Sequence, residues 1–166
     1  MSKSMFTLSE RKSAKYIIKA NANNPLLLDN TVVIHAYPNK TGFKCYLHEK
    51  ALTLATKSMT VNERYKKKLE NPDAYKSEHF ARVFSVTVNR ANCKTPKDIE
   101  KTDLNAINAL ITELDERANA IIERENTKKE SANADKKESA SKKANADKKA
   151  NAKTDKSAKK ESAKNA

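Results

Sequence analysis

The chain has 166 residues, of which 34 are Lys or Arg and 21 are Asp or Glu, giving a formal net charge of +13. This length allows one domain with a substantial core, and the positive charge favours polyanionic partners such as nucleic acid. No run of about 18 apolar residues occurs, which argues against a membrane partner. The N-terminal sequence MSKSMFTLSERK lacks the apolar segment of a signal peptide. We therefore expect a protein that is not secreted and is cytoplasmic or nucleoid-associated.

The composition divides the chain near residue 126. Residues 127–166 contain no Val, Ile, Leu, Phe, Tyr, Met or Cys, and they repeat KKESA three times and ANADKK twice. Such a segment cannot bury enough apolar surface to offset the entropy of folding. We predict a single α+β domain over residues 1–126 and a disordered, basic Lys/Ala/Asn-rich tail over residues 127–166.

Residues 8–21 are predicted to form a helix. Thr7 and Glu10 have the spacing of a capping box, and Ile17 and Ile18 are available to a core. Basic residues recur about every four positions, so they would form a stripe that is either a solvated face or a contact for a phosphate backbone. The stripe consists of Arg11, Lys12, Lys15 and Lys19.

The stretch 31–48, TVVIHAYPNKTGFKCYLH, contains the only glycine of the chain and predicts a β-hairpin around the turn formers PNKTG. Strand alternation separates its side chains into two faces. The inner face is apolar and consists of Val32, Ile34, Ala36, Phe43, Cys45 and Leu47. The outer face mixes rings with positive charge and consists of Val33, His35, Tyr37, Lys44, Tyr46 and His48, with Lys40 in the turn.

The outer face of this hairpin is the candidate binding surface. Its rings can stack on bases and its lysines can contact phosphates, the combination used by proteins that bind single strands. The alternative is ordinary cross-strand packing of Tyr37 and Tyr46. Residues 49–59, whose apolar spacing is closer to a helix than to a strand, either cover these two tyrosines or leave them open.

Two further elements precede the last helix. Thr60 and Glu63 form a second capping-box pattern, which predicts a short helix ending near Glu70 with a buried stripe. That stripe consists of Val61, Tyr65 and Leu69. Residues 80–90, FARVFSVTVNR, alternate as a strand. Together with the hairpin 31–48 they predict a small antiparallel sheet of at least three strands, packed with helices.

A long amphipathic helix is predicted to follow Thr95, which can cap it, and Pro96, which suits its first position. Its apolar residues follow a 3-4 spacing typical of a coiled coil. Two interpretations stay open: this stripe covers the inner face of the sheet, or it forms the seam of a homodimer. The stripe consists of Leu104, Ile107, Ile111, Leu114, Ala118 and Ile121.

The sequence lacks the patterns of catalytic, metal and cofactor sites. A single glycine excludes the phosphate-binding and dinucleotide-binding loops, and no HExxH, paired CxxC or Gly-x-Ser-x-Gly motif occurs. His35, His48 and His79 lack the paired spacing of zinc ligands. Cys45 and Cys93 are expected to be free thiols. We expect no enzymatic activity, no metal and no cofactor.

Two functional hypotheses follow. The first is a noncatalytic nucleic-acid-binding protein, for DNA or RNA, that uses the hairpin face, a basic N-terminal helix and the basic tail. The alternative is a protein-interaction or inhibitory accessory factor, for instance viral and host-directed, that docks on another protein or on a nucleoprotein complex.

Overall fold

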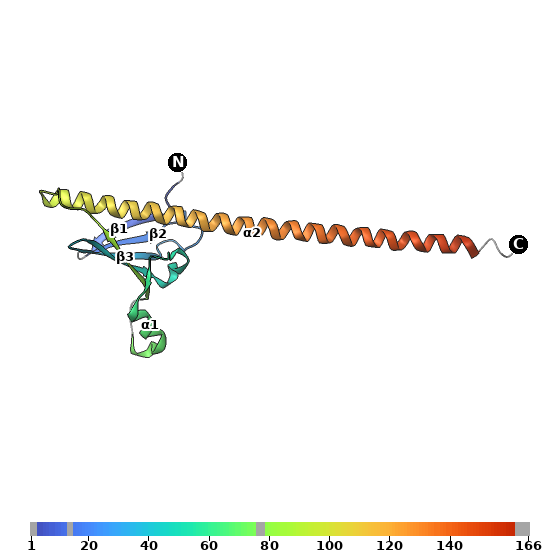
Figure 1. Ribbon diagram of the computed structural model, residues 1–166, viewed down its shortest axis with the longest axis horizontal. Coiled ribbons are helices and arrows are strands. Elements are labelled where there is room, and N and C mark those ends of the chain that lie inside the picture. The colour runs from blue at the N-terminus through green and yellow to red at the C-terminus, as the bar shows by residue number, and fades with distance from the viewer. Residues whose placement is uncertain (1–2, 13–14, 76–78, 162–166) are drawn as a thin grey trace. The chain divides into compact units, whose positions relative to one another are not determined.

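The computed structural model describes the backbone of residues 3–12, 15–75 and 79–161 and the side chains of residues 3–9, 16–75 and 79–134. Within these residues it shows an α+β fold, with a six-stranded antiparallel sheet and a long C-terminal helix (Figure 1). The chain divides into two compact units, Met1–Ala120 and Ile121–Ala166. The sheet and the beginning of the long helix belong to the first unit, which is described here by itself.

The strands of the sheet follow the order β1-β2-β3-β4-β6-β5. The predicted hairpin is confirmed as β3 and β4, in a register that places Ile34 opposite Leu47 and Ala36 opposite Cys45. The turn between them is shorter than PNKTG, because Asn39 already pairs with Gly42. The bounds are β1 Phe6–Lys12, β2 Lys15–Ala20, β3 Val32–Asn39, β4 Gly42–His48, β5 Thr60–Val61 and β6 Phe80–Thr87.

The helix predicted over residues 8–21 is wrong, because this segment forms the hairpin of β1 and β2. Tyr16, Ile18 and Ala20 are all buried, an alternation of period two that a helix cannot produce. Pairing with β3 places Ile18 opposite Ile34 on the inner face and Ile17 opposite His35 on the outer face. Burial on a sheet therefore outweighs the local capping pattern, and there is no basic helix face.

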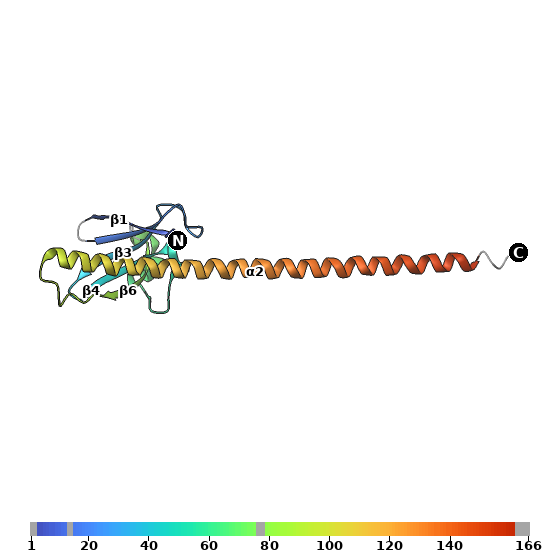
Figure 2. The ribbon, with the colours of Figure 1, turned by 90° about the horizontal axis from the view of Figure 1, so that it is seen from above.

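Five of the six residues predicted for the inner face of the hairpin are confirmed as core, whereas Val32 is only half-buried and Val33, predicted for the outer face, is buried. Ile34, Ala36, Phe43, Cys45 and Leu47 are all buried. Helix α2, Pro96–Glu161, lies along this face with its N-terminal part (Figure 2). It buries four apolar residues there: Ile107, Leu110, Leu114 and Ala118.

The burial of its residues tests whether the apolar stripe of α2 is core or a dimer seam. Ile107, Leu114 and Ala118 lie in the core of a single chain, so the interpretation that the stripe covers the sheet holds for them. The other three members of the stripe are half-buried: Leu104, Ile111 and Ile121. A homodimer contact through these three stays a prediction.

The start of α2 follows the capping prediction. The Thr95 hydroxyl accepts a hydrogen bond from the Asp98 amide (3.2 Å), and the Asp98 carboxylate accepts one from the Thr95 amide (2.8 Å), a reciprocal capping box. The side-chain and backbone hydrogen bonds from Thr95 lower the pKa of Asp98. This end of the helix is therefore encoded locally.

The segment after β4 forms a 3₁₀ helix, η1 Glu49–Leu54, in place of the predicted α-helix. Ala51 and Leu54 are buried. Arg117 of α2 donates a hydrogen bond from Nε to the carbonyl of Leu54 (2.7 Å) and one from Nη2 to the carbonyl of Ala55. The end of η1 is therefore held on the α2 side of the sheet.

Helix α1, Glu63–Glu70, ends where predicted but begins differently and buries no residue. Its N-cap is Asn62, whose side chain accepts a hydrogen bond from the Arg64 amide, while Thr60 and Val61 form β5. The predicted buried stripe is wrong, because Val61 is 43% and Leu69 67% exposed. A short 3₁₀ helix, η2 Pro72–Ala74, follows α1.

Helix α2 continues as far as Glu161 and so runs through most of the segment predicted to be disordered. All described side chains of residues 123–134 are exposed. Ala, Lys and Glu have high helix propensity, so a helix that packing has already started can extend through the repeats. Residues 162–166, the end of the predicted tail, lie outside the described residues.

We expect the helix of residues 127–161 to melt well below the unfolding temperature of the domain, because it is supported by propensity alone. The measurement is circular dichroism at 222 nm during heating of the full chain and of a chain truncated after Asn126. The difference between the 222 nm signals of the two chains, which reports on residues 127–161, should disappear at a lower temperature than the cooperative transition of the domain. Loss of both signals in one transition would contradict this expectation.

Candidate nucleic-acid interface

Rings gather on the outer face of the sheet, opposite α2. Two come from β3, two from β4, and two from the residue before β6 and its first residue. Among the described residues, each lies within 6.4 Å of another member, measured between ring centroids. We call this set the ring row: His35, Tyr37, Tyr46, His48, His79 and Phe80.

Five rings of the row form a continuous chain of neighbours in space, from Tyr37 at one end to His79 at the other. The centroid distances are 5.7 Å for Tyr37–Tyr46, 6.4 Å for Tyr46–Phe80, 5.3 Å for Phe80–His48 and 6.1 Å for His48–His79. Most of these pairs meet edge to face, an arrangement that aromatic quadrupoles favour. Tyr37 and Tyr46 are only half-buried, so part of each ring faces solvent.

The strand register brings these rings to one face. His35 lies opposite Tyr46 in the β3–β4 ladder, so both project to the same side. Phe80 joins them through a register shift between β4 and β6, at which Leu47 pairs with Arg82 but His48 pairs with Phe80. Regular alternation from Arg82 would have turned Phe80 to the inner face. The sequence gives no sign of this shift, and Phe80 was not among the predicted site residues.

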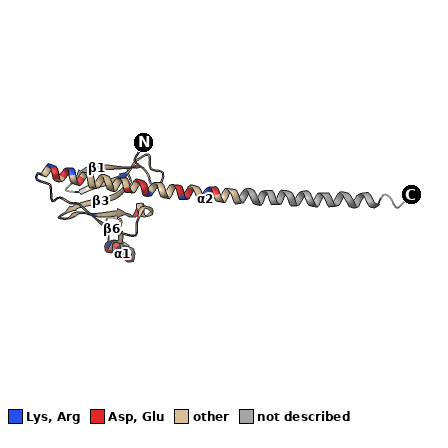
Figure 3. Ribbon diagram, turned by 45° about the horizontal axis from the view of Figure 1, so that its top comes forward, with Lys and Arg blue, Asp and Glu red and all other residues tan. Residues whose placement is uncertain are grey.

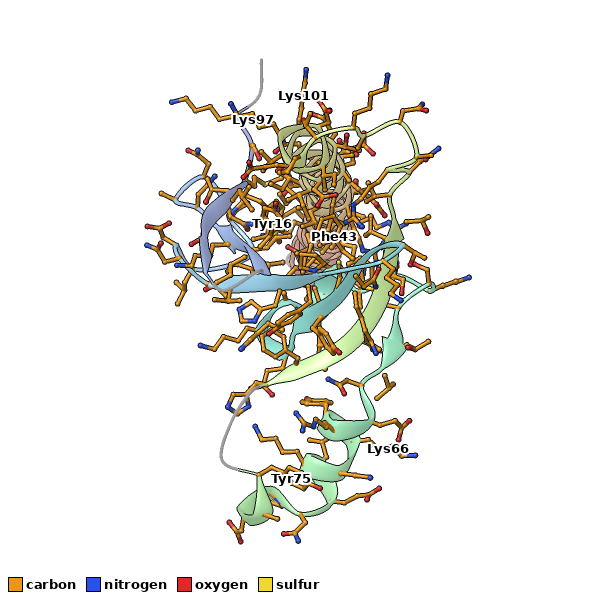
Figure 4. The ribbon with its side chains drawn as sticks, turned by 90° about the vertical axis from the view of Figure 1, so that its left-hand side faces the viewer. Tyr16, Phe43, Lys66, Tyr75, Lys97 and Lys101 are labelled. Carbon is orange, nitrogen blue, oxygen red and sulfur yellow. The ribbon has the colours of Figure 1, made fainter. Side chains whose placement is uncertain are left out.

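Residues 49–59 leave Tyr37 and Tyr46 of the ring row half-exposed. The Arg117 hydrogen bonds hold the end of η1 on the side of α2, and the carbonyl of Met59 accepts a hydrogen bond from Arg82, which pairs with inner-face Leu47. Helix α1 lies on the side of the sheet away from α2, which is the side of the ring row, and next to β6 (Figure 4). Tyr37 and Tyr46 pack on each other across the strands (5.7 Å between ring centroids), and both stay half-exposed, so residues 49–59 do not bury them.

Lysines flank the two ends of the ring row. The Lys44 ammonium lies 5.9 Å from the centroid of Tyr46, and Lys44 is exposed. At the other end, the Lys68 ammonium of α1 contacts both ring nitrogens of His79, and Glu49 Oε1 lies 2.8 Å from His79 Nδ1. Figure 3 shows Lys, Arg, Asp and Glu along α1 and the described part of α2, whereas β3, β4 and β6 carry few charged residues.

The predicted site residues fall into three groups. Those of the hairpin come together around the ring row, with Lys40 exposed in the adjoining turn. Lys19 is half-buried on β2, away from any helix face. The remaining three lie in β1 and β2, and their side chains are outside the described residues: Arg11, Lys12 and Lys15.

His48 links the row to η1. Its Nδ1 accepts a hydrogen bond from the Lys50 amide (3.2 Å), which caps the 3₁₀ helix. Burial lowers the pKa of His48; Glu49 raises it, whereas His79, Lys50 and Lys68 lower it further. Burial, the largest of these influences, therefore disfavours the imidazolium form of His48 in the free protein.

The cysteines take no part in this site. Both are free, and Cys45 lies in the core, where burial raises the pKa of its thiol to about 12.

Within the described part of the chain, no group of three or more His, Cys, Asp or Glu residues is arranged to hold a metal ion. Nor does that part contain a helix long and apolar enough to cross a membrane.

Comparisons with protein-family models, with curated proteins and with solved structures find no match for this chain. The functional interpretation of the ring row therefore rests on its geometry. Phe80 in the middle of the row is buried, but the half-exposed rings of Tyr37 and Tyr46 offer stacking surfaces for bases, and the lysines at the two ends offer cations for phosphates. Proteins that bind single strands use both.

Proposed function

We propose that the protein binds single-stranded nucleic acid on the outer face of its sheet, without catalysing a reaction. The observation that carries this proposal is the ring row, half-exposed at Tyr37 and Tyr46, with a lysine at each end. Bases of a duplex are stacked on one another and cannot lie on these rings, so the surface favours an unpaired strand. The choice between DNA and RNA is left to the experiment.

The energy of stacking sets the size of the expected effect. Removing an aromatic platform costs about 1–3 kcal/mol per base, whereas lysines of the tail add attraction that is independent of sequence and sensitive to salt. The net charge supports the electrostatic contribution, since lysines and arginines outnumber acids by 13. The rings would therefore determine preference for a single strand, and the lysines overall affinity.

Tyr37→Ala and Tyr46→Ala are each expected to weaken binding of a fluorescent oligothymidylate about tenfold, the lower end of the stacking range. The measurement is fluorescence anisotropy at two salt concentrations, with single- and double-stranded probes of DNA and of RNA. Tyr75→Ala is the matched control, because Tyr75 is also partly exposed but lies outside the ring row. Its affinity should stay within about twofold of that of the wild type.

The same titration on a chain truncated after Asn126 separates the domain from the tail. Binding by the truncated chain that falls with either tyrosine variant supports the proposal. Binding that disappears with the tail, or that is unchanged in both tyrosine variants, contradicts it.

Helix α1 favours a second candidate function, docking on an acidic protein surface. It buries none of its residues, exposes Leu69 by 67% and carries three consecutive lysines, Lys66–Lys68. An apolar side chain beside cations suits a protein partner with an acidic rim. Leu69→Ser should abolish capture of such a partner and leave oligonucleotide affinity unchanged, because it removes the exposed apolar side chain without adding a charge beside Lys68.

A further inference from the structure

All three histidines of the chain lie in the ring row. Histidine is the side chain that ordinarily changes charge between about pH 5 and pH 8. Since the chain has no histidine elsewhere, any charge that imidazoles acquire in this range appears on one surface. That surface is the one we propose to contact nucleic acid.

Charged groups of η1 and α1 surround two of these histidines, His48 and His79. His79 faces Glu49 of η1 at 2.8 Å and Lys68 of α1, and its side chain is 50% exposed. His48 lies 6.1 Å from His79, accepts a hydrogen bond from the Lys50 amide and is influenced by the same Glu49 and Lys68. In the free protein, the positive charges of Lys50 and Lys68 outnumber the single negative charge of Glu49 beside these rings.

We propose that protonation of His48 and His79 strengthens the binding of a single strand, so that affinity rises as pH falls. The inference rests on the proposed function. A phosphate placed beside these rings would supply the negative charge that one carboxylate provides only in part, and it would favour the imidazolium forms. At His48 the added proton goes to Nδ1 and replaces the hydrogen bond from the Lys50 amide. By linkage, a ligand that favours the protonated forms binds more tightly where protons are more available.

The protons taken up on binding give the expected size of the effect. The dissociation constant of the full chain for oligothymidylate should fall about tenfold between about pH 7.5 and pH 5.5, at constant ionic strength. Neither thymine nor the phosphodiester titrates in this range, and tail lysines keep their charge. The change therefore reports on the protein surface and not on the probe.

The test variant is His48→Asn/His79→Gln. Asparagine can still accept the hydrogen bond that caps η1, and glutamine can still donate to Glu49, but neither titrates. The double variant should bind with less than about a twofold change over the same pH range. Lys44→Gln is the control: it should weaken binding at every pH and retain the tenfold pH dependence, because it removes a fixed charge at the other end of the row.

The outcomes separate this inference from the function on which it rests. Binding with no pH dependence in the wild type, or with the same dependence in the double variant, overturns the inference and leaves the proposed function standing. Absence of binding at every pH overturns both. Circular dichroism at each pH confirms that folded protein is compared, since the lowered pKa of His48 means that stability decreases as pH falls below the unfolded value of about 6.5.

Discussion

Replacing Gly42 by alanine is expected to lower the free energy of unfolding by about 4 kcal/mol or more, a large part of the stability of a small domain. Gly42 begins β4 with a φ of 148°, a conformation that residues with a Cβ rarely adopt. A Cβ atom here would lie 2.0 Å from the carbonyl oxygen of Val86 and 2.8 Å from the amide nitrogen of Val88. Both are backbone atoms, so they cannot move away without opening the β4–β6 ladder.

Denaturant titration monitored by circular dichroism checks this prediction. Thr41→Ala is the matched control, because Thr41 precedes Gly42, is exposed, and its side-chain hydrogen bond joins exposed atoms. We expect the control to change stability by about 0.5 kcal/mol or less. Equal unfolding midpoints for the two variants would show that the contact with β6 does not constrain residue 42.

Replacing Asp103 by alanine is expected to cost about 3 kcal/mol, because it leaves a largely buried guanidinium without its counter-ion. Asp103 Oδ1 accepts a hydrogen bond from Arg90 Nε at 2.8 Å, and the two side chains are 9% and 18% exposed. Arg90 also donates to the carbonyls of Asn39 (2.6 Å) and Gly42 (3.2 Å). This one side chain therefore joins the hairpin turn, the segment that follows β6 and the first turns of α2.

A double-mutant cycle with Arg90→Met isolates the pair. We expect each single variant to be less stable than the wild type and the double variant to lose less than the sum, with a coupling of about 1–2 kcal/mol. Glu113→Ala, which removes an exposed carboxylate elsewhere on α2, should change stability by about 0.5 kcal/mol or less. Additive losses in the cycle would mean that Arg90 acts through its carbonyl contacts alone.

Much of the candidate site was predictable from the hairpin sequence. Strand alternation over residues 31–48 predicts both faces, and the structure brings His35, Tyr37, Tyr46 and His48 together as that alternation requires. Phe80 was not predictable, because a register shift places it in the row. Alternation along one strand carries no information about a shift that arises between two strands.

The N-terminal segment shows the opposite case. Tyr16, Ile17 and Ile18 suit a helix or a strand, and the capping pattern at Thr7 favoured the helix. Pairing with β3 decided for a strand, because it buries Tyr16 and Ile18 on the inner face and supplies ladder hydrogen bonds to the backbone. Local pattern was ambiguous here, and the neighbouring strand resolved it.

The features that depend on contiguous residues follow from the amino-acid pattern alone: the β3–β4 hairpin with most of its apolar inner face, and the capped start of α2 at Thr95. Contacts between distant segments place the end of η1 on the α2 side, bury most of the α2 stripe, and leave Tyr37 and Tyr46 half-exposed. The physical reason is that these outcomes depend on which elements compete for one buried surface. That competition is settled by packing between segments far apart in the chain, such as Arg117 and Leu54.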